Sequence, residues 1–372
     1  MHDPFPLKPP TGLIPYAQKL ADRLSLQTLP LHFHEVIVAY SIYHATNKYI
    51  SPILSRAFFP RTYNALNART KLNWDVHVVS FVQSVVICTL ALWVMWADTE
   101  RTEMDTTERV HGYTGASGLI QAFAGGYFLW DLVITVQNVR IFGVGMLFHA
   151  ISALCVFSLG FRPFVNFYAP TFILYELSSP FLNIHWFCDK LNMTGSTLQF
   201  LNGIVLLLTF FSCRLVWGTY NSIRVFADVW RAYTAGPLDL STDRQAALKT
   251  AHLSGTGDSV LYFAHGQTVP LWLAGAYLAS NLCLNGLNWF WFAKMIETLR
   301  KRFDPPLGTR RADDKDGAVA VEQEKVLVEG TSVLTPAAVP ADSADYLRAG
   351  EKVEVKSTGK HLEVGARTRR RG

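Results

Sequence analysis

The sequence predicts an all-α fold: a polytopic membrane helix bundle of six or seven transmembrane helices with a disordered C-terminal tail. Half of the 372 residues are hydrophobic and only 17% are charged, and the charges are crowded into a few stretches. Long apolar segments separate those stretches, as expected when the segments lie in hydrocarbon. The first residues lack the charged start and short apolar run of a cleavable signal peptide, so we expect insertion through an internal helix.

The transmembrane helices are predicted from the length of the apolar segments. A bilayer core of about 30 Å needs about 20 mostly apolar helical residues. Six windows meet this requirement, at residues 74–97, 118–137, 141–160, 164–187, 197–217 and 269–292. A seventh window at residues 31–50 is interrupted by His32, His34, Glu35, His44 and Lys48. That window either spans the bilayer or lies in the interface, and the pattern leaves both open.

The windows divide the chain into an N-terminal flank of residues 1–30, a transmembrane domain of residues 31–303 and a tail of residues 304–372. The tail has mixed charges, few aromatic residues and no sustained periodicity. Such a segment cannot bury enough apolar surface to fold, so we predict that it is disordered. The five cysteines show no paired spacing, so we predict neither a disulfide framework nor a zinc site.

The charges of the short loops predict the orientation. The loop between the windows at 31–50 and 74–97 carries only positive charges, at Arg56, Arg61, Arg69 and Lys71, whereas the next loop is mostly acidic. Positive residues in short loops stay on the cytosolic side of the membrane. We therefore expect the N-terminal flank on the non-cytosolic side, and the basic loop and the tail in the cytosol.

Three ionisable residues fall at membrane depth: Asp131, His149 and Glu176. Placing an ionisable side chain at the centre of a membrane helix costs about 2.5 to 3.5 kcal/mol, even on the scale derived from insertion experiments, which gives the lowest values. Each of the three therefore needs a partner, a cavity or a function. Each also shares a helical stripe with other polar residues, among them Thr135, Asn138, Ser152, Ser179 and Asn183. Lipid offers no hydrogen bonds, so these polar faces should turn inward.

These three residues allow two interpretations. They either hydrogen-bond one another and hold the bundle together, or they form a site in the cytosolic half of the membrane. In a site, His149 is suited to act as a base, with Asp131 or Glu176 fixing its tautomer. The same constellation could instead relay protons or bind a lipid head group. We favour a shared cavity, because Pro180 predicts a helix kink beside Glu176.

Several polar residues near the window ends have simpler interpretations. Trp74 and His77 begin their window, and His185 and Trp186 lie at the end of theirs, where aromatic side chains commonly anchor in the membrane interface. We interpret Arg214, near the end of the window at 197–217, as a side chain that snorkels to the interface.

One run of residues resembles a known family. Residues 175–187, YELSSPFLNIHWF, resemble the signature of the TLC-domain family, which includes ceramide synthases and translocating-chain-associating membrane proteins. Three further matches follow the family's order: WDVHVVS at 74–80, GYFLWDL at 126–132, and NWFW at 288–291. These motifs contain the candidate substrate-binding residues Asn183, Ser179, Tyr127, Trp74 and His77, beside the candidate catalytic residues His149, Asp131 and Glu176.

The resemblance also implies a function. Ceramide synthases carry a paired histidine motif, whereas here Phe148 precedes the single His149. The chain therefore looks more similar to the TLC-domain-containing branch, some of whose members are linked to membrane phospholipid composition. This implies that the protein handles membrane lipids in the endoplasmic reticulum. It could be an enzyme that transfers an acyl group from acyl-CoA to a lipid acceptor through His149 and the nearby acids. The alternative is a non-enzymatic lipid sensor or cargo escort.

The expected partners follow from the same reading. They are membrane lipids and not nucleic acid, and self-association into a homo-oligomer is left open. We expect no bound cofactor and no metal, and acyl-CoA enters only as the co-substrate that the resemblance implies. Whether the protein is an enzyme is likewise left open by the sequence.

Overall fold

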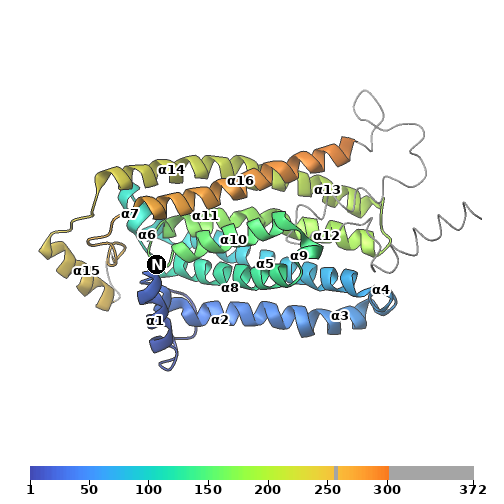
Figure 1. Ribbon diagram of the computed structural model, residues 1–372, viewed down its shortest axis with the longest axis horizontal. Helices are drawn as coiled ribbons and strands as arrows, with labels where there is room; N and C mark the ends of the chain where they lie inside the picture. Colours follow the sequence, from blue (N-terminus) through green and yellow to red (C-terminus); the bar gives the residue numbers. More distant parts are fainter. Residues whose placement is uncertain (255–258, 301–372) are drawn as a thin grey trace, which may run out of the picture.

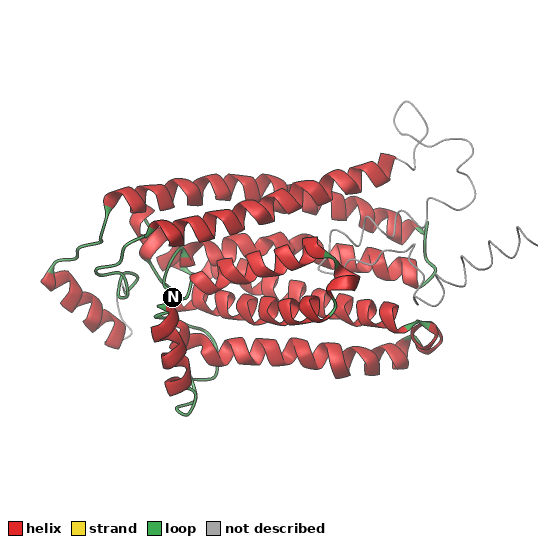
Figure 2. Ribbon diagram, in the orientation of Figure 1, coloured by secondary structure: helices red, strands yellow, loops and turns green. Residues whose placement is uncertain are grey.

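The computed structural model describes residues 1–254 and 259–300 (Figure 1). Within these ranges the chain is helical and contains no strand (Figure 2). The long helices run side by side along one axis of the molecule. The predicted all-α membrane bundle is therefore confirmed, while the predicted disordered tail at residues 304–372 lies outside the described residues.

The described helical elements follow one another along the chain in the order below. The first half comprises α1 (Ile14–Leu24), α2 (Leu29–Ala45), the π-helical η1 (Thr46–Ile50), α3 (Ser51–Phe58), α4 (Pro60–Ala65), α5 (Ala68–Ala97), α6 (Thr99–Thr102), α7 (Thr106–His111), α8 (Gly115–Gln137), α9 (Val139–Phe142) and α10 (Val144–Leu159). The second half comprises the 3₁₀ segment η2 (Asn166–Tyr168), α11 (Ala169–Ile173), the 3₁₀ segment η3 (Leu174–Ser178), α12 (Ser179–Lys190), α13 (Thr197–Thr209), the π-helical η4 (Phe210–Trp217), α14 (Gly218–Ala235), α15 (Thr242–Ser254) and α16 (Leu271–Arg300).

Three helical runs are long and apolar enough to cross a membrane: Ala68–Ala97, Thr106–Gln137 and Thr197–Ala235. They contain the predicted windows at 74–97, 118–137 and 197–217. Helix α10 is apolar but has only 16 residues, fewer than the roughly 20 that a straight span needs. The window at 31–50 forms α2 and η1, which continue directly into α3.

Two predicted windows are interrupted in the structure. The window at 141–160 breaks at Gly143, whose φ of 82° is a left-handed conformation that favours glycine. The window at 164–187 is built from η2, α11, η3 and α12 rather than from one α-helix. Pro180 lies in the first turn of α12 and has no amide hydrogen to bond the carbonyl of Glu176. The predicted irregularity beside Glu176 is therefore present, as a 3₁₀ segment.

The bundle has two distinct ends. The N-terminus, α6, α7 and α15 lie at one end, and α3, α4, the end of α12 and the end of α16 lie at the other (Figure 1). The N-terminal flank folds against the first of these ends, where the Met1 amine donates to Asp98 Oδ1 over 2.8 Å. Helix α2 packs closely on α8, because Gly126 brings the α8 backbone next to Val36 and Ala39.

Candidate functional site

A cavity of about 30 Å³ lies between α8, α10, α11, η3, η4 and α16, with room for about two water molecules. Much of its wall is apolar, with Phe128, Val156 and Phe172 among the contributors. Its polar lining comes from four helical elements and comprises His149, Glu176, Arg214, Asn281 and Asn288. Apolar walls with a few convergent polar groups are typical of ligand sites, although such pockets usually measure about 300 to 1,000 Å³ and this cavity is much smaller.

Arg214 is the centre of the polar network beside this cavity. Its Nη2 lies 3.5 Å from Glu176 Oε1 and donates to Ser179 Oγ over 3.1 Å. Its Nε donates to Ser178 Oγ over 3.0 Å, and its Nη1 donates to Asn288 Oδ1 over 3.1 Å. The residue is only 4% exposed. The prediction that Arg214 snorkels to the interface was therefore wrong, because all three guanidinium nitrogens have partners inside the protein.

Local helix geometry positions the two charged partners. Arg214 lies in η4, where the π-helical turn is wider than an α-turn, and such segments are frequent at functional sites. Glu176 lies in η3, directly before the proline-containing first turn of α12. Ser179 donates its hydroxyl to Glu176 Oε2 over 2.8 Å, so the predicted site residues Glu176 and Ser179 are in direct contact.

His149 lines the same cavity from α10. Its ring lies 5.7 Å from the Trp291 ring and 6.2 Å from the Phe128 ring, measured between centroids. The Nδ1 atom is buried and has no hydrogen-bond partner, so neither acid fixes the ring through that nitrogen. Arg214 is close enough to act on the imidazole electrostatically. The free nitrogen is therefore available to a bound group.

Asp131 is buried in α8 but is not among the residues that line this cavity. Its Oδ2 has no hydrogen-bond partner, and Glu176 is close enough to act on it electrostatically. The structure therefore brings two of the three predicted catalytic residues, His149 and Glu176, to one cavity. The third lies nearby, outside its lining.

A second polar cluster joins α5 to α12. His77 Nδ1 lies 2.7 Å from Asn183 Oδ1, and the Asn183 amide donates to Ser80 Oγ over 3.1 Å. The His77 ring stacks on Trp186 at 4.1 Å between centroids, and its Nε2 is buried without a hydrogen-bond partner. Two predicted substrate-binding residues, His77 and Asn183, are thus in contact, but neither lines the cavity beside Arg214.

The other two predicted substrate-binding residues are core residues. Trp74 is 2% exposed, donates its Nε1 to Ser55 Oγ over 2.8 Å and packs against Tyr63 and Trp186. The interpretation of Trp74 and Trp186 as interface anchors was therefore wrong, because protein side chains cover both. Tyr127 is buried in α8, where its ring packs against Tyr43.

Sequence reasoning missed Arg214 and Asn288 as members of the site. The signal for Arg214 was present: an arginine inside an apolar window commonly faces the bundle interior. Asn288 was noted only as part of a family motif. Its role became visible only when α16 was placed against η4.

The comparison with known proteins agrees with this architecture. A TLC domain profile matches residues 73–297, which include the cavity and the cluster around His77. An uncharacterized TLC domain-containing protein of Schizosaccharomyces pombe is 35% identical over 79% of this chain and 87% of its own length. The topoisomerase I damage affected protein 4 of Saccharomyces cerevisiae is 26% identical, over 76% of this chain and 89% of its own length.

A vertebrate relative extends the comparison. The TLC domain-containing protein 4-B of Danio rerio is 25% identical, over 72% of this chain and 88% of its own length. The matched region in all these comparisons is most of the helical bundle. This chain belongs to the TLC domain family.

Proposed function

We propose that this protein handles membrane lipids by receiving a polar group of a lipid in the cavity lined by His149, Glu176 and Arg214. The observation that carries the proposal is the buried guanidinium beside an imidazole with a free Nδ1. Ionisable groups inside membrane proteins are costly and commonly mark binding or transport sites. Buried polar atoms normally have a hydrogen-bond partner, and a group bound in the cavity would supply one to this nitrogen.

The size of the cavity limits what it receives. About 30 Å³ accommodates a hydroxyl, amide or ester group in place of bound water, but not an acyl chain. The acyl chains would therefore stay outside the cavity, against the apolar exterior of the bundle. The polar group and the acyl chains would therefore lie in different environments.

Acyl transfer is the second candidate, and the free Nδ1 of His149 favours it. In this reaction the imidazole nitrogen attacks the thioester carbon of acyl-CoA and the CoA thiolate leaves. A hydroxyl or amine of the acceptor lipid then attacks the acyl carbon, and the bond to the imidazole breaks. The neutral imidazole of His149 is regenerated, and the acceptor's proton passes to the CoA thiolate released in the first step. Arg214 would hold Glu176 and Ser179 in place, because its guanidinium nitrogens are already engaged.

The test compares three purified proteins in detergent and in nanodiscs: wild type, His149→Ala, and the control Phe148→Ala on the exposed face of the same helix. Retained lipids are identified by mass spectrometry, and transfer is followed with labelled acyl-CoA. We expect wild type and Phe148→Ala to retain a lipid class that His149→Ala retains at least tenfold less. If all three retain the same lipids, the cavity is not the binding site.

The two candidates separate in the same experiment. Transfer of label by wild type and Phe148→Ala, but not by His149→Ala, would establish the acyltransferase. Lipid retention without transfer would leave a sensor or cargo escort. We also propose the endoplasmic reticulum as the membrane in which it acts, supported by the family resemblance, and co-localisation of the tagged protein with a resident marker tests this.

A further inference from the structure

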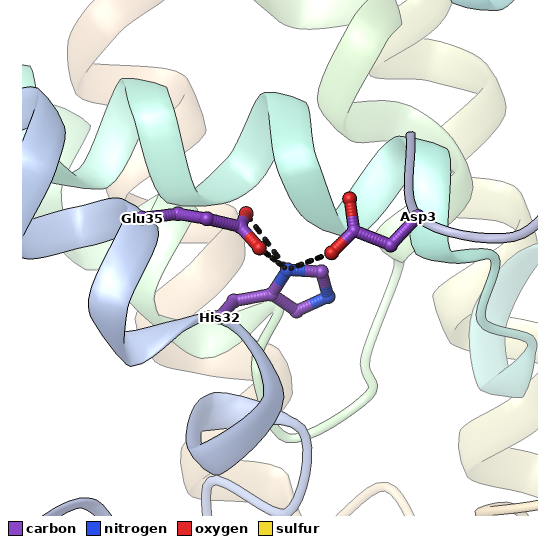
Figure 3. Close-up of side chains that lie close together, drawn as sticks. All are labelled: Asp3, His32 and Glu35. Carbon is purple, nitrogen blue, oxygen red and sulfur yellow. Dashed lines mark hydrogen bonds and ion pairs between the residues drawn. The ribbon is translucent and has the colours of Figure 1, made fainter. Parts of the chain in front are cut away.

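A second cluster of titratable side chains lies away from the cavity, where the N-terminal flank meets α2. It consists of Asp3, His32 and Glu35 (Figure 3). His32 Nδ1 lies 3.0 and 2.9 Å from the two oxygens of Glu35, and 3.6 Å from Asp3 Oδ2. The His32 and Glu35 side chains are fully buried, whereas Asp3 is 29% exposed. The three ligand atoms lie within 4.8 Å of one another.

This arrangement poses an electrostatic problem. A single N–H on Nδ1 satisfies only one hydrogen bond, but three carboxylate oxygens lie around that nitrogen. Two carboxylates that share a site repel each other, and a shared proton or a bound cation relieves the repulsion. The neighbouring basic groups have other partners: the Met1 amine is paired with Asp98 and Glu100, and His34 Nε2, which lies 3.8 Å from Glu35 Oε1, is 2.9 Å from the Leu7 carbonyl oxygen.

We propose that Asp3, His32 and Glu35 bind a first-row divalent transition metal, with Zn²⁺ as the representative ion. Metal bonds of about 2.1 Å from nitrogen and carboxylate oxygen place neighbouring ligand atoms about 3.0 to 3.4 Å apart. The distances from Nδ1 to the Glu35 and Asp3 oxygens, 2.9 to 3.6 Å, bracket that spacing. One imidazole and two carboxylates favour such a metal over Mg²⁺, which prefers oxygen ligands alone.

The surroundings of His32 suit a metal ligand. Its Nε2 lies 2.6 Å from the Tyr113 hydroxyl, so the nitrogen remote from the cluster has a fixed partner. Metal-binding histidines almost always donate that other ring N–H to a neighbouring acceptor, which fixes the tautomer. Gly118 makes room for the ring, because a Cβ there would lie 2.3 Å from Nε2. The partly exposed Asp3 leaves the cluster accessible from solvent.

A metal ion bound to this cluster would link the N-terminal flank to α2. Asp3 belongs to the N-terminal flank, whereas His32 and Glu35 belong to α2, so one ion would join the two segments. His34 of α2 already contacts the flank, because its Nε2 lies 2.9 Å from the carbonyl oxygen of Leu7. The proposal is independent of the lipid function, because no residue of this cluster lines the cavity.

Zinc binding to the full chain, purified in detergent and stripped with a chelator, tests the proposal by calorimetry and elemental analysis. We expect one Zn²⁺ per chain and an increase in melting temperature on its addition. Asp3→Asn and Glu35→Gln should each weaken binding at least tenfold and lose most of that increase. The matched control Asp22→Asn changes an exposed carboxylate on α1 that pairs with Gln18, and should bind as wild type does.

Two results would overturn the metal site. The first is a wild-type chain that binds no Zn²⁺ at micromolar concentration, which would favour a proton shared between the carboxylates. The second is unchanged Zn²⁺ affinity in both Asp3→Asn and Glu35→Gln, which would place the ion elsewhere. Asp3→Asn keeps the experiment decisive if Glu35→Gln fails to fold, because Asp3 is at the surface. Excess Mg²⁺ should not displace the bound Zn²⁺.

Discussion

Removing the guanidinium of Arg214 would leave the Glu176 carboxylate buried without its cation. Breaking a buried ion pair from one side typically costs about 3 to 5 kcal/mol, because the remaining charge stays desolvated. We therefore expect Arg214→Met to lower the apparent melting temperature strongly. The double variant Arg214→Met with Glu176→Gln should recover much of that loss, since no unpaired charge remains. Thermal unfolding in detergent measures all three proteins.

The exposed pair Lys294–Glu297 on α16 is the matched control for Arg214. Its two atoms are 3.0 Å apart, but both side chains are more than a third exposed. Solvent screening limits such pairs to about 0 to 1 kcal/mol, so Glu297→Gln should leave the melting temperature nearly unchanged. Equal losses in Arg214→Met and in the double variant would mean that Glu176 is not the group that Arg214 stabilises.

Individual residues were predictable where the hydropathy pattern made them exceptional. Asp131, His149 and Glu176 were identified because each is ionisable inside an apolar window, and all three are buried. Arg214 was misjudged because its distance from the window end suggested snorkelling, and only tertiary contacts reveal the direction of a side chain. The cluster of Asp3, His32 and Glu35 was missed because Asp3 is far from His32 and Glu35 in the sequence.

Helix packing provides a prediction about Gly126. A Cβ at this position would lie 2.6 Å from the Val36 carbonyl oxygen and 2.7 Å from the Ala39 Cβ, so α8 and α2 would have to separate. We expect Gly126→Ala to cost about 1 to 3 kcal/mol, the usual penalty for overpacking. The loss should appear as a lower melting temperature and as faster proteolysis within α2.

Gly145 on α10 is the control for Gly126, because a Cβ there meets no atom within 4 Å. Alanine is favoured over glycine inside a helix by about 0.5 to 1 kcal/mol, so Gly145→Ala should be neutral or stabilising. A Gly126→Ala protein as stable as Gly145→Ala would show that the α2 and α8 contact is looser than the structure indicates.

Whole elements were predictable when one period of hydrophobicity continued through them. The windows at 74–97 and 118–137 fall inside α5 and α8 because each is predominantly apolar, contains no proline and ends where its helix ends. The window at 164–187 is also apolar, but prolines at 170 and 180 divide it into α-helical and 3₁₀ pieces. Because mean hydropathy is an average over the whole window, it predicts that the segment is buried but not that its helix is interrupted.

At the scale of the whole molecule, the ends of the bundle agree with the charge pattern. The basic stretch of α3 and α4 lies at the same end as Arg300, where α16 ends, and the acidic stretch around α6 lies at the other end with the N-terminus (Figure 1). The helical run Thr197–Ala235 has 39 residues and is about 58 Å long, far more than a bilayer core of about 30 Å. Its last turns should therefore project beyond the membrane, carrying the connection to α15 with them.

This geometry makes the orientation testable with glycans. The native sequon Asn192-Met193-Thr194 follows α12 at the end that we expect in the cytosol, so it should carry no glycan in eukaryotic cells. Asp239→Asn creates a new sequon with Leu240 and Ser241, in the exposed connection between α14 and α15 at the opposite end. We expect only the Asp239→Asn protein to gain a mobility shift that peptide N-glycosidase removes.

The control for the new sequon is Asp239→Asn combined with Ser241→Ala, which keeps the asparagine but destroys the acceptor motif. It should migrate as the wild type does. A glycan at Asn192, with none at the new sequon, would reverse the assigned orientation, because the two sites lie at opposite ends of one bundle. The basic loop would then face the lumen against the positive-inside rule, and the basic residues of that loop would need a protein partner to account for them.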